Sequence, residues 1–293
     1  MQNYQVHSRL VLKMCRATYP ASLMVLLIFL FLISIGCVSR SAARWNSSGL
    51  DHYRHGDFEN AYESFSEAIA LLPDSAELYY NRANAAVRLS RVRDANADFT
   101  RAIELDPTHV DAYLARGDLS FNHSRYDAAR ADWSSVVGLS PNNADAYRRR
   151  GQALEHLDRF SDAVADFDRA VLLAPKDPAC LISRGRFYFR TGQFDNALTD
   201  LTGAASLDPR SAEPYLYRGL VYEYGLFRPE DALADYSRAV DNSPKDPYVR
   251  NYRANLLRKL GKTADALADF SVICRMGYPF GCWQVDWLTD ETK

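Results

Sequence analysis

Two sets of charged residues recur along this chain at nearly constant spacing, and they are the first candidates for chemistry. Six arginines and six aspartates are each repeated at intervals of 34 or 35 residues. A row of regularly placed arginines is one way to build a phosphate-binding stripe. The arginines are Arg82, Arg116, Arg150, Arg184, Arg218 and Arg253, and the aspartates are Asp98, Asp132, Asp166, Asp200, Asp235 and Asp269.

The same two rows also have a structural explanation. One period upstream, Ser48 and Ser64 replace both the arginine and the aspartate. Joint presence and joint absence indicate Arg–Asp bridges between neighbouring helices, because charged groups rarely enter a packed interface without a partner. We therefore predict six structural ion pairs, and an anion-binding role for the arginines is the alternative.

Other residues give little support for metal binding or catalysis. His52 and His55 lie one helical turn apart, near Asp51 and Asp57, which provides at most half of a metal site. The sequence has no nucleophile elbow, zinc-protease motif, phosphate-binding loop or dinucleotide fingerprint. We expect no metal, no cofactor and no enzymatic activity.

The cysteines fall in separate settings. Cys274 and Cys282 flank the sequence MGYPFG. In an oxidising compartment a disulfide there would attach the C-terminal segment to the preceding helix, and two free thiols are the alternative. Cys180 occupies a helix-packing position and is expected to be a small buried residue. Cys15 and Cys37 belong to the N-terminal region.

Residues 1–36 differ in kind from the rest of the chain. They carry three basic residues and no acidic one, and residues 23–35 read LMVLLIFLFLISI. Basic residues followed by a short apolar run are typical of an export signal. An uncleaved signal anchor is the alternative, because the 23 uncharged residues 17–39 just span a bilayer core of about 30 Å. Either leader places the remaining chain outside the cytoplasm.

The overall composition is that of a folded protein. Apolar residues make up 47% of the 293 residues and charged residues 25%, and the formal net charge is −2. A near-neutral chain is not a nucleic-acid binder that relies on bulk positive charge, so we expect no nucleic-acid partner. The 14 glycines and 12 prolines are too few for an all-β chain rich in turns.

A sequence repeat defines the elements that must position the charged rows. Prolines recur at spacings of 34, 34, 34, 34 and 35; an alanine lies twelve residues before each, and a large apolar residue lies eight before. These offsets place the alanine and the large residue on one face of a helix, which the proline then ends. The upstream half of each period has its own pattern of a large residue four positions before a small one, which predicts another helix. The prolines are Pro73, Pro107, Pro141, Pro175, Pro209 and Pro244.

This pattern resembles the tetratricopeptide repeat family, whose unit is a helix hairpin of 34 residues. The resemblance implies an all-α fold, an α-solenoid coiled as a right-handed superhelix, with seven repeat units and a capping helix at 278–293. One unit carries an extra residue, which we place in the turn near Phe227 and Arg228. The seven units are 42–75, 76–109, 110–143, 144–177, 178–211, 212–246 and 247–277.

In this family the first helices of the units line a concave groove that binds extended peptides or partner helices. Transferred by unit spacing, the resemblance implies a groove of aromatic and polar side chains in this chain. Its central arginines would bind an acidic segment or a C-terminal carboxylate of the partner. The alternative is that these arginines are scattered, solvated charges without a ligand. The groove residues are Tyr80, Asn84, Asp118, Phe121, Arg148, Arg149, Gln152, Arg186, Phe189 and Arg190.

The end of the leader resembles a bacterial lipobox. In residues 34–37 a small residue precedes Cys37, which in lipoproteins carries the lipid and becomes the mature N-terminus. A tether of residues 37–41 would then join the lipid to the first unit. Val38 weakly favours the outer membrane in bacteria that have one.

We therefore expect a membrane-anchored scaffold or adaptor for protein–protein interactions. It would lie in the bacterial cell envelope and face away from the cytoplasm. A receptor-type module that binds a peptide or glycan in the same groove is the alternative.

Overall fold

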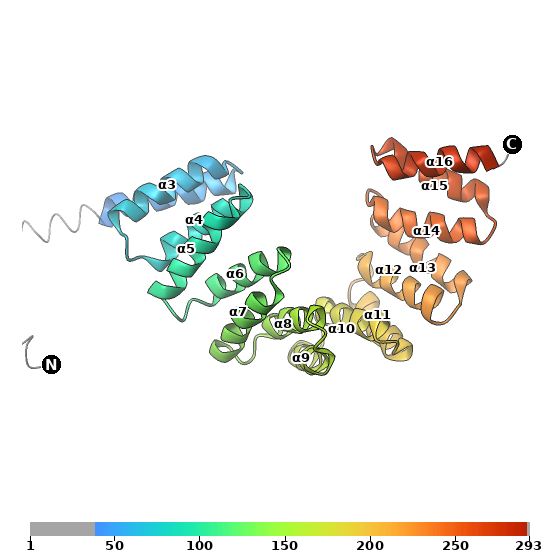
Figure 1. Ribbon diagram of the computed structural model, residues 1–293, viewed down its shortest axis with the longest axis horizontal. Coiled ribbons are helices and arrows are strands. Elements are labelled where there is room, and N and C mark those ends of the chain that lie inside the picture. Colours follow the sequence, from blue (N-terminus) through green and yellow to red (C-terminus); the bar gives the residue numbers. More distant parts are fainter. Residues whose placement is uncertain (1–38, 292–293) are drawn as a thin grey trace, which may run out of the picture. The chain divides into compact units, whose positions relative to one another are not determined.

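The computed structural model describes residues 39–291, and every regular element in that range is a helix (Figure 1). Apart from α12, which continues into the π-helix η1, the helices that follow residue 57 contain 13 or 14 residues. The elements are a helix over residues 39–54, α3 (Phe58–Leu71), α4 (Ala76–Arg88), α5 (Val92–Leu105), α6 (Val110–Asn122), α7 (Tyr126–Leu139), α8 (Ala144–His156), α9 (Phe160–Leu173), α10 (Pro178–Arg190), α11 (Phe194–Leu207), α12 (Glu213–Leu220), η1 (Val221–Gly225), α13 (Pro229–Asn242), α14 (Pro247–Lys259), α15 (Thr263–Arg275) and α16 (Pro279–Glu291).

Side-chain caps help to start the first helices of several units. The side chains of Asn143, Asp177 and Asp246 accept hydrogen bonds from backbone amides in the first turns of α8, α10 and α14. Such caps satisfy amides that have no partner within the helix. Pro178 and Pro247 occupy the next position, where the missing amide costs nothing. The proline of the repeat therefore ends one helix, and a cap begins the next.

Each hairpin is packed around one large side chain of its second helix. These side chains are almost fully buried, and the alanine one turn earlier is fully buried. The first helix presents a glycine or alanine at the contact: a Cβ added at Gly151 would lie 2.9 Å from the Phe167 ring, and one at Gly219 would lie 2.5 Å from Tyr236. The small residues thus let the helices approach closely. The large residues are Phe65, Phe99, Trp133, Phe167, Leu201, Tyr236 and Phe270.

The turn within each hairpin contains one residue in the left-handed region. Glycine reaches this conformation freely, and short polar residues tolerate it better than bulky ones. Three turns use glycine and three use serine or aspartate, whereas the sixth uses Phe227, with φ of 54° and a side chain that is 81% exposed. The other residues are Gly56, Ser90, Ser124, Asp158, Gly192 and Gly261.

The extra residue of the sixth unit lies upstream of the position that we expected. Val221–Gly225 form a π-helix, and the Leu226 amide donates to the Val221 carbonyl, five residues earlier, at 3.0 Å. A π-helix accommodates one extra residue without breaking the helix. The insertion is therefore contained in the first helix, and the turn at Phe227 keeps the backbone conformation of the other turns.

The chain divides into two compact units at Leu119 and Ser120, inside α6. In the N-terminal compact unit, Ala83, Ala95 and Phe99 belong to one buried cluster. Residues 39–41 are already helical there, so the tether that we expected over 37–41 does not extend through them. The buried Ala42 directly follows them, which makes this first turn part of the packed fold.

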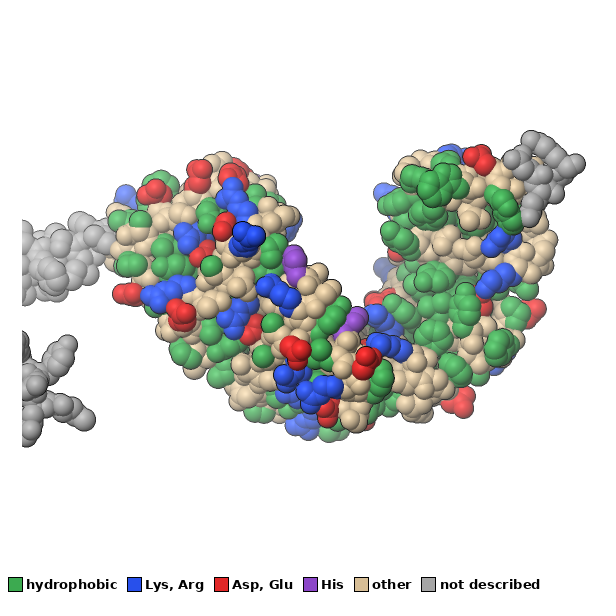
Figure 2. Space-filling view, viewed as in Figure 1, with side chains coloured by type: hydrophobic (Ala, Val, Ile, Leu, Met, Phe, Trp, Pro, Cys, Tyr) green, Lys and Arg blue, Asp and Glu red, His purple; other side chains and the backbone are tan. Residues whose placement is uncertain are grey.

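The C-terminal compact unit ends in the expected capping helix. Leu288 of α16 is buried with Phe270 and Ile273 of α15. Of the aromatic residues that we expected to cover this end, Trp283 is 70% exposed and Trp287 is 45% exposed. These two residues are one helical turn apart, on a different side of α16 from Leu288. Hydrophobic side chains consequently gather on the surface over α14 and α16 (Figure 2).

Candidate functional site

The structure brings together both members of five predicted Arg–Asp pairs. In each pair the arginine Nε donates to one carboxylate oxygen and Nη2 to the other, at 2.7 or 2.8 Å. Arg116 and Asp132 fall in different compact units, so the geometry of the sixth pair is not described. The five pairs are Arg82–Asp98, Arg150–Asp166, Arg184–Asp200, Arg218–Asp235 and Arg253–Asp269.

These pairs are mainly structural. Their aspartates are buried, and the five arginine side chains are only 12–21% exposed. The hydrogen bonds to Asp166 raise the pKa of Arg150, against the opposing effect of burial. Two parallel, charge-assisted hydrogen bonds fix the position of one helix against the other, which explains why arginine rather than lysine recurs.

Four arginines of the row also bond to the preceding repeat. Their Nη1 atoms donate to a hydroxyl or carboxylate oxygen of the preceding second helix, at 2.8 to 3.2 Å. One guanidinium thereby joins two units, and in three of these cases it contacts three helices. The bonds are Arg82–Ser66, Arg116–Thr100, Arg184–Asp168 and Arg218–Thr202.

The predicted groove residues Tyr80 and Asn84 line a cavity of about 270 Å³ in the N-terminal compact unit. The ring of Tyr80 contacts the rings of Phe99 and His109, with centroid distances of 6.0 and 4.9 Å. Burial raises the pKa of Tyr80, so its hydroxyl stays protonated at neutral pH. The lining residues are Leu50, Tyr53, Phe65, Tyr80, Asn81 and Asn84. All but Phe65 come from the first helices of two successive units.

The predicted arginines of the fourth unit are neutralised within their own helix. Arg148 and Arg149 both contact Asp145 in the first turn of α8. Burial alone would raise the pKa of Asp145, but the two arginines lower it below its usual range. Gln152 lies within 3.5 Å of Arg148 Nη1 and of the Ser183 hydroxyl. This part of the groove is an ion-pair network.

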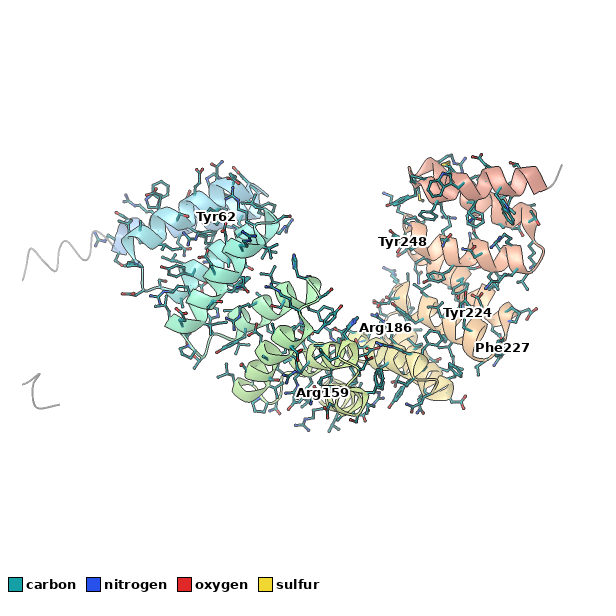
Figure 3. The ribbon with its side chains drawn as sticks, in the orientation of Figure 1. Tyr62, Arg159, Arg186, Tyr224, Phe227 and Tyr248 are labelled. Atoms are coloured by element: carbon teal, nitrogen blue, oxygen red, sulfur yellow. A yellow bond between two sulfur atoms is a disulfide. The ribbon has the colours of Figure 1, made fainter. Side chains whose placement is uncertain are left out.

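The arginines of the fifth unit also have local partners. Arg186, which is labelled in Figure 3, lies 3.7 Å from Glu213. Its guanidinium carbon lies 4.6 Å from the centroid of the Tyr217 ring. Arg190 contacts Glu155 at 3.2 Å and Asp158 at 3.5 Å. These arginines are therefore neither a free basic patch for an acidic segment nor scattered solvated charges, because each has an acidic partner nearby.

The remaining predicted groove residues, Asp118, Phe121 and Phe189, are not among the residues that line the Tyr80 cavity. Asp118 is a half-buried residue of α6. Phe121 belongs to an aromatic cluster with Tyr126, Trp133 and His156. Phe189 packs against Phe194 at 6.3 Å. Both phenylalanines therefore support hairpin packing in the C-terminal compact unit.

Sequence reasoning missed Leu50, Asn81 and Tyr217 as surface-forming residues. A signal for two of them was available, because Asn81 and Tyr217 directly precede Arg82 and Arg218 of the arginine row. Adjacent residues on a helix point about 100° apart. If the arginine row faces one side of each helix, the residues just before it therefore share another side, where they can form a common surface.

The cysteines have distinct environments. Cys274 and Cys282 form a disulfide with a Cα–Cα distance of 4.6 Å, which joins α15 to α16. Cys180 is a buried thiol, and burial together with Asp177 raises its pKa to about 12. The proposed lipid site Cys37 and the whole leader lie outside the described residues.

Within residues 39–291, the two closely spaced histidines each lie near an aspartate. His52 lies 3.3 Å from Asp57, and His55 lies 3.7 Å from Asp51. No group of three potential metal ligands occurs among the described residues. The helices in this range are also too short or too polar to cross a bilayer.

Comparison with known sequences supports one family. A model described as tetratricopeptide repeat matches residues 80–133, 114–178, 183–247 and 223–277, and a TPR repeat model matches residues 49–90. The DnaJ homolog subfamily C member 7 homolog of Schizosaccharomyces pombe is 38% identical over 63 residues, which are 20% of this chain and 13% of that protein. The chain therefore matches only a small part of that curated relative.

Solved structures share the fold at low sequence identity. A tetratricopeptide repeat protein from Parabacteroides merdae has a TM-score of 0.71 and 19% identity, covering 85% of this chain and 99% of that one. Yeast Tom70 has a TM-score of 0.64 and 17% identity, with coverages of 88% and 55%. Pseudomonas aeruginosa pilF has a TM-score of 0.61 and 14% identity, with coverages of 74% and 99%.

Proposed function

Because the chain belongs to the tetratricopeptide repeat family, we propose that it is a protein-binding scaffold that holds an extended segment of a partner protein. The observation that carries this proposal is the Tyr80 cavity, which is formed by first helices of successive units. It combines aromatic walls with amide groups, as protein-binding surfaces commonly do. This repeat fold generally serves as an interaction scaffold.

The side chains around the cavity suit a peptide. Tyr53 packs edge-on against Phe58, and Tyr80 is fixed by its two ring neighbours, so both rings are positioned before a ligand arrives. Asn81 already donates to Asn46 at 3.2 Å. The Asn84 side chain is hydrogen-bonded to Tyr80, and its remaining amide donor and acceptor capacity can pair with a peptide backbone. We propose that Tyr53 and Tyr80 contact a side chain of the partner while Asn84 bonds its main chain.

Site-specific photocrosslinking tests this function. A photoreactive phenylalanine is placed at Tyr53 in the full chain, and cells are irradiated before membranes are extracted. The matched control places the same group at Leu172, which is 70% exposed on the second helix of the fourth unit. We expect discrete protein adducts from position 53 that are lost when Asn84→Ala is added, and none of these adducts from position 172.

The outcomes distinguish specific binding in the groove from non-specific binding to the surface. Identical adducts at both positions, or no protein adduct from position 53, would contradict the scaffold function assigned to this groove. An adduct with a glycan in place of a protein would instead support the receptor-type alternative.

We further propose that the scaffold is anchored in a bacterial cell envelope through a lipid on Cys37. The basic and apolar leader and the small residue before Cys37 support this proposal. The described helix begins two residues after Cys37, so a lipid there would hold the first unit close to the membrane surface. Mass spectrometry of the mature N-terminus tests the anchor: a lipidated Cys37 is expected, and an intact leader would contradict it.

A further inference from the structure

Two arginines of the row differ from the others in how they use Nη1. Arg150 and Arg253 form their aspartate pairs, but neither Nη1 bonds to the hydroxyl of the preceding second helix among the described residues. The hydroxyls of Ser134 and Ser237 donate to carbonyl oxygens of their own helices, as those of Ser66 and Thr100 do, but within residues 39–291 they accept no bond from the row arginine. Both positions coincide with a cavity between successive second helices.

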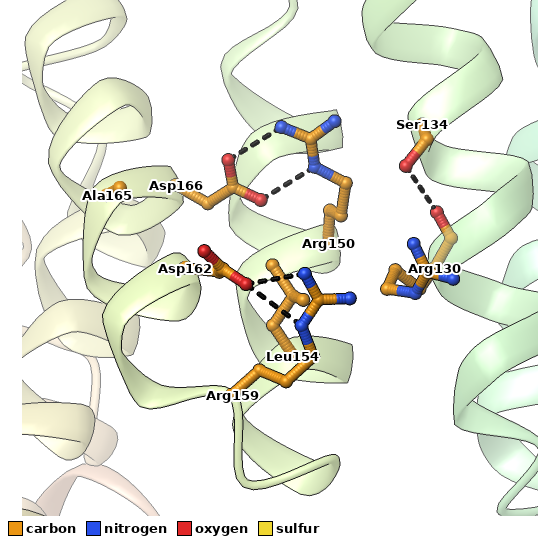
Figure 4. Close-up of a pocket in the computed structure, with 8 residues that line it drawn as sticks. All are labelled: Arg130, Ser134, Arg150, Leu154, Arg159, Asp162, Ala165 and Asp166. Carbon is orange, nitrogen blue, oxygen red and sulfur yellow. Dashed lines mark hydrogen bonds and ion pairs between the residues drawn. The ribbon is translucent and has the colours of Figure 1, made fainter.

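Three arginines line the cavity of the fourth unit (Figure 4). It measures about 260 Å³, far more than the roughly 10–15 Å³ that one water needs. The guanidinium groups of Arg150 and Arg159 face α7, which carries Arg130 and Ser134. Leu154 forms an apolar part of the wall. The lining residues are Arg130, Ser134, Arg150, Leu154, Arg159, Asp162, Ala165 and Asp166.

Hydrogen-bond donors exceed acceptors in this cavity. Arg150 uses Nε and Nη2 on Asp166, and Arg159 uses Nε and Nη2 on Asp162. A guanidinium has five N–H groups, so each keeps its Nη1 donors for another acceptor. The Nε atom of Arg130 is buried without a hydrogen-bond partner, and its ion-pair contact to Asp127 is long, at 3.7 Å. Three cations thus face two lining carboxylates.

The seventh unit provides a comparison within the same chain. Its cavity has the same frame, with a serine, the row arginine and two aspartates at the equivalent positions. Leu233 stands in place of Arg130, and Lys262 stands in place of Arg159. That lining has two cations and two carboxylates, so its formal charges cancel. The fourth unit differs by one additional positive charge at Arg130.

We propose that the fourth-unit cavity binds an oxyanion, a carboxylate or a phosphoryl group, between α7 and α9. The anion accepts hydrogen bonds from the Nη1 atoms of Arg150 and Arg159 and balances the charge of Arg130. Its donors come from α8 and from the turn before α9, and none of its lining residues lines the Tyr80 cavity. Of the arginines in the row, only Arg150 is proposed to bind an anion. It keeps its ion pair with Asp166 while doing so.

The test follows the arginine Nε–H signals of the full chain by NMR, in detergent and at constant ionic strength. Inorganic phosphate and acetate are titrated separately, which distinguishes a phosphoryl from a carboxylate ligand. The test variants are Arg130→Leu and Arg159→Gln, which install the side chains found at the equivalent positions 233 and 193. Arg210→Leu, in an exposed loop, is the control for loss of one charge.

We expect saturable shifts of the Arg150 and Arg159 signals with at least one of the two anions. Both variants should weaken this binding about tenfold or more, because each removes a charged partner, whereas Arg210→Leu should leave it unchanged. Equal affinity in the wild type and Arg130→Leu, or no saturable shift with either anion, would overturn the proposal. Retained Arg–Asp signals and an unchanged thermal midpoint show that the variants are folded. Crosslinking from Tyr53 is a separate measurement, so the two proposals can fail independently.

Discussion

At the scale of single residues, the most informative group is the guanidinium of the arginine row. Five arginines hold a buried aspartate with two parallel bonds, and four arginines of the row also reach the preceding unit. Pairing of this kind limits how far two helices can slide or rotate against each other. A charge that is common in the sequence is therefore largely unavailable to a binding partner.

Removing one member of such a pair should be costly. In the pair Arg184–Asp200, Asp200 is only 4% exposed. The variant Asp200→Leu therefore leaves the Arg184 guanidinium without its main partner. We expect a loss of about 3 kcal/mol in unfolding free energy, measured by urea denaturation. The double variant Arg184→Met/Asp200→Leu should recover part of this loss. Equal stability of the single and double variants would contradict the pairing argument.

The thiol of Cys180 should be unreactive in the folded protein. Its pKa is raised to about 12, so the thiolate that reacts with alkylating reagents is scarce at pH 8. An unfolded cysteine has a pKa of about 8.5 and reacts readily. Alkylation of Cys180, followed by mass spectrometry of its peptide, should therefore proceed only at the rate of unfolding. Rapid modification under native conditions would show that the site is open.

At the scale of elements, the sixth hairpin combines two departures from the repeat. The π-helix Val221–Gly225 takes up the extra residue, and the turn keeps a left-handed residue although that residue is phenylalanine. We expected the extra residue in the turn near Phe227, because the spacing of the repeat cannot distinguish an insertion in a turn from one in a π-helix. The turn at Phe227 has the same left-handed residue as the other turns, so the extra residue is taken up by the π-helix and not by the turn.

Phe227→Gly should stabilise this hairpin. The side chain is 81% exposed and contributes little burial, whereas glycine adopts φ of 54° without the strain that a bulky residue carries. We expect a gain of about 1 kcal/mol, measured as a higher urea midpoint. Ser90→Gly at the matched turn should give a smaller gain. A loss on Phe227→Gly would indicate that the ring makes a stabilising contact.

The disulfide should control the capping helix locally. Cys274 and Cys282 are eight residues apart, for which loop closure predicts a contribution of about 2.5 kcal/mol. In Cys274→Ser/Cys282→Ser, amide hydrogen exchange in α16 should accelerate while exchange in α8 and α9 stays unchanged. Unaltered exchange in α16 would mean that the contacts of Leu288 with α15 suffice to hold the cap.

At the scale of the whole molecule, the helix hairpins and the core could be predicted because a buried alanine and a large residue repeat at helical spacing. The functional surface could not be predicted equally well. Whether Arg148 and Arg149 are free or paired depends on Asp145 in the same helix turn, and no periodic rule fixes such surface choices. Trp283 and Trp287 are likewise of a residue type that is typical of a core, yet they lie on an exposed face of α16.

A core substitution should act on neighbouring hairpins and leave distant ones unaffected. Phe167 is fully buried and contacts Phe187 of the next unit at 5.5 Å between ring centroids. Phe167→Ala should cost about 3–5 kcal/mol and increase hydrogen exchange in α8 to α10. Helices α3 to α5 should keep their protection. A uniform loss across both compact units would instead show a single cooperative fold.

The two missing Nη1 bonds also have a mechanical consequence. Within the C-terminal compact unit, the junctions Ser134–Arg150 and Ser237–Arg253 lack the bond that Asp168–Arg184 and Thr202–Arg218 retain. When the chain is pulled along its length, the junctions without this bond resist shear least. The third and fourth hairpins, and the sixth and seventh, are where this unit would first yield under tension.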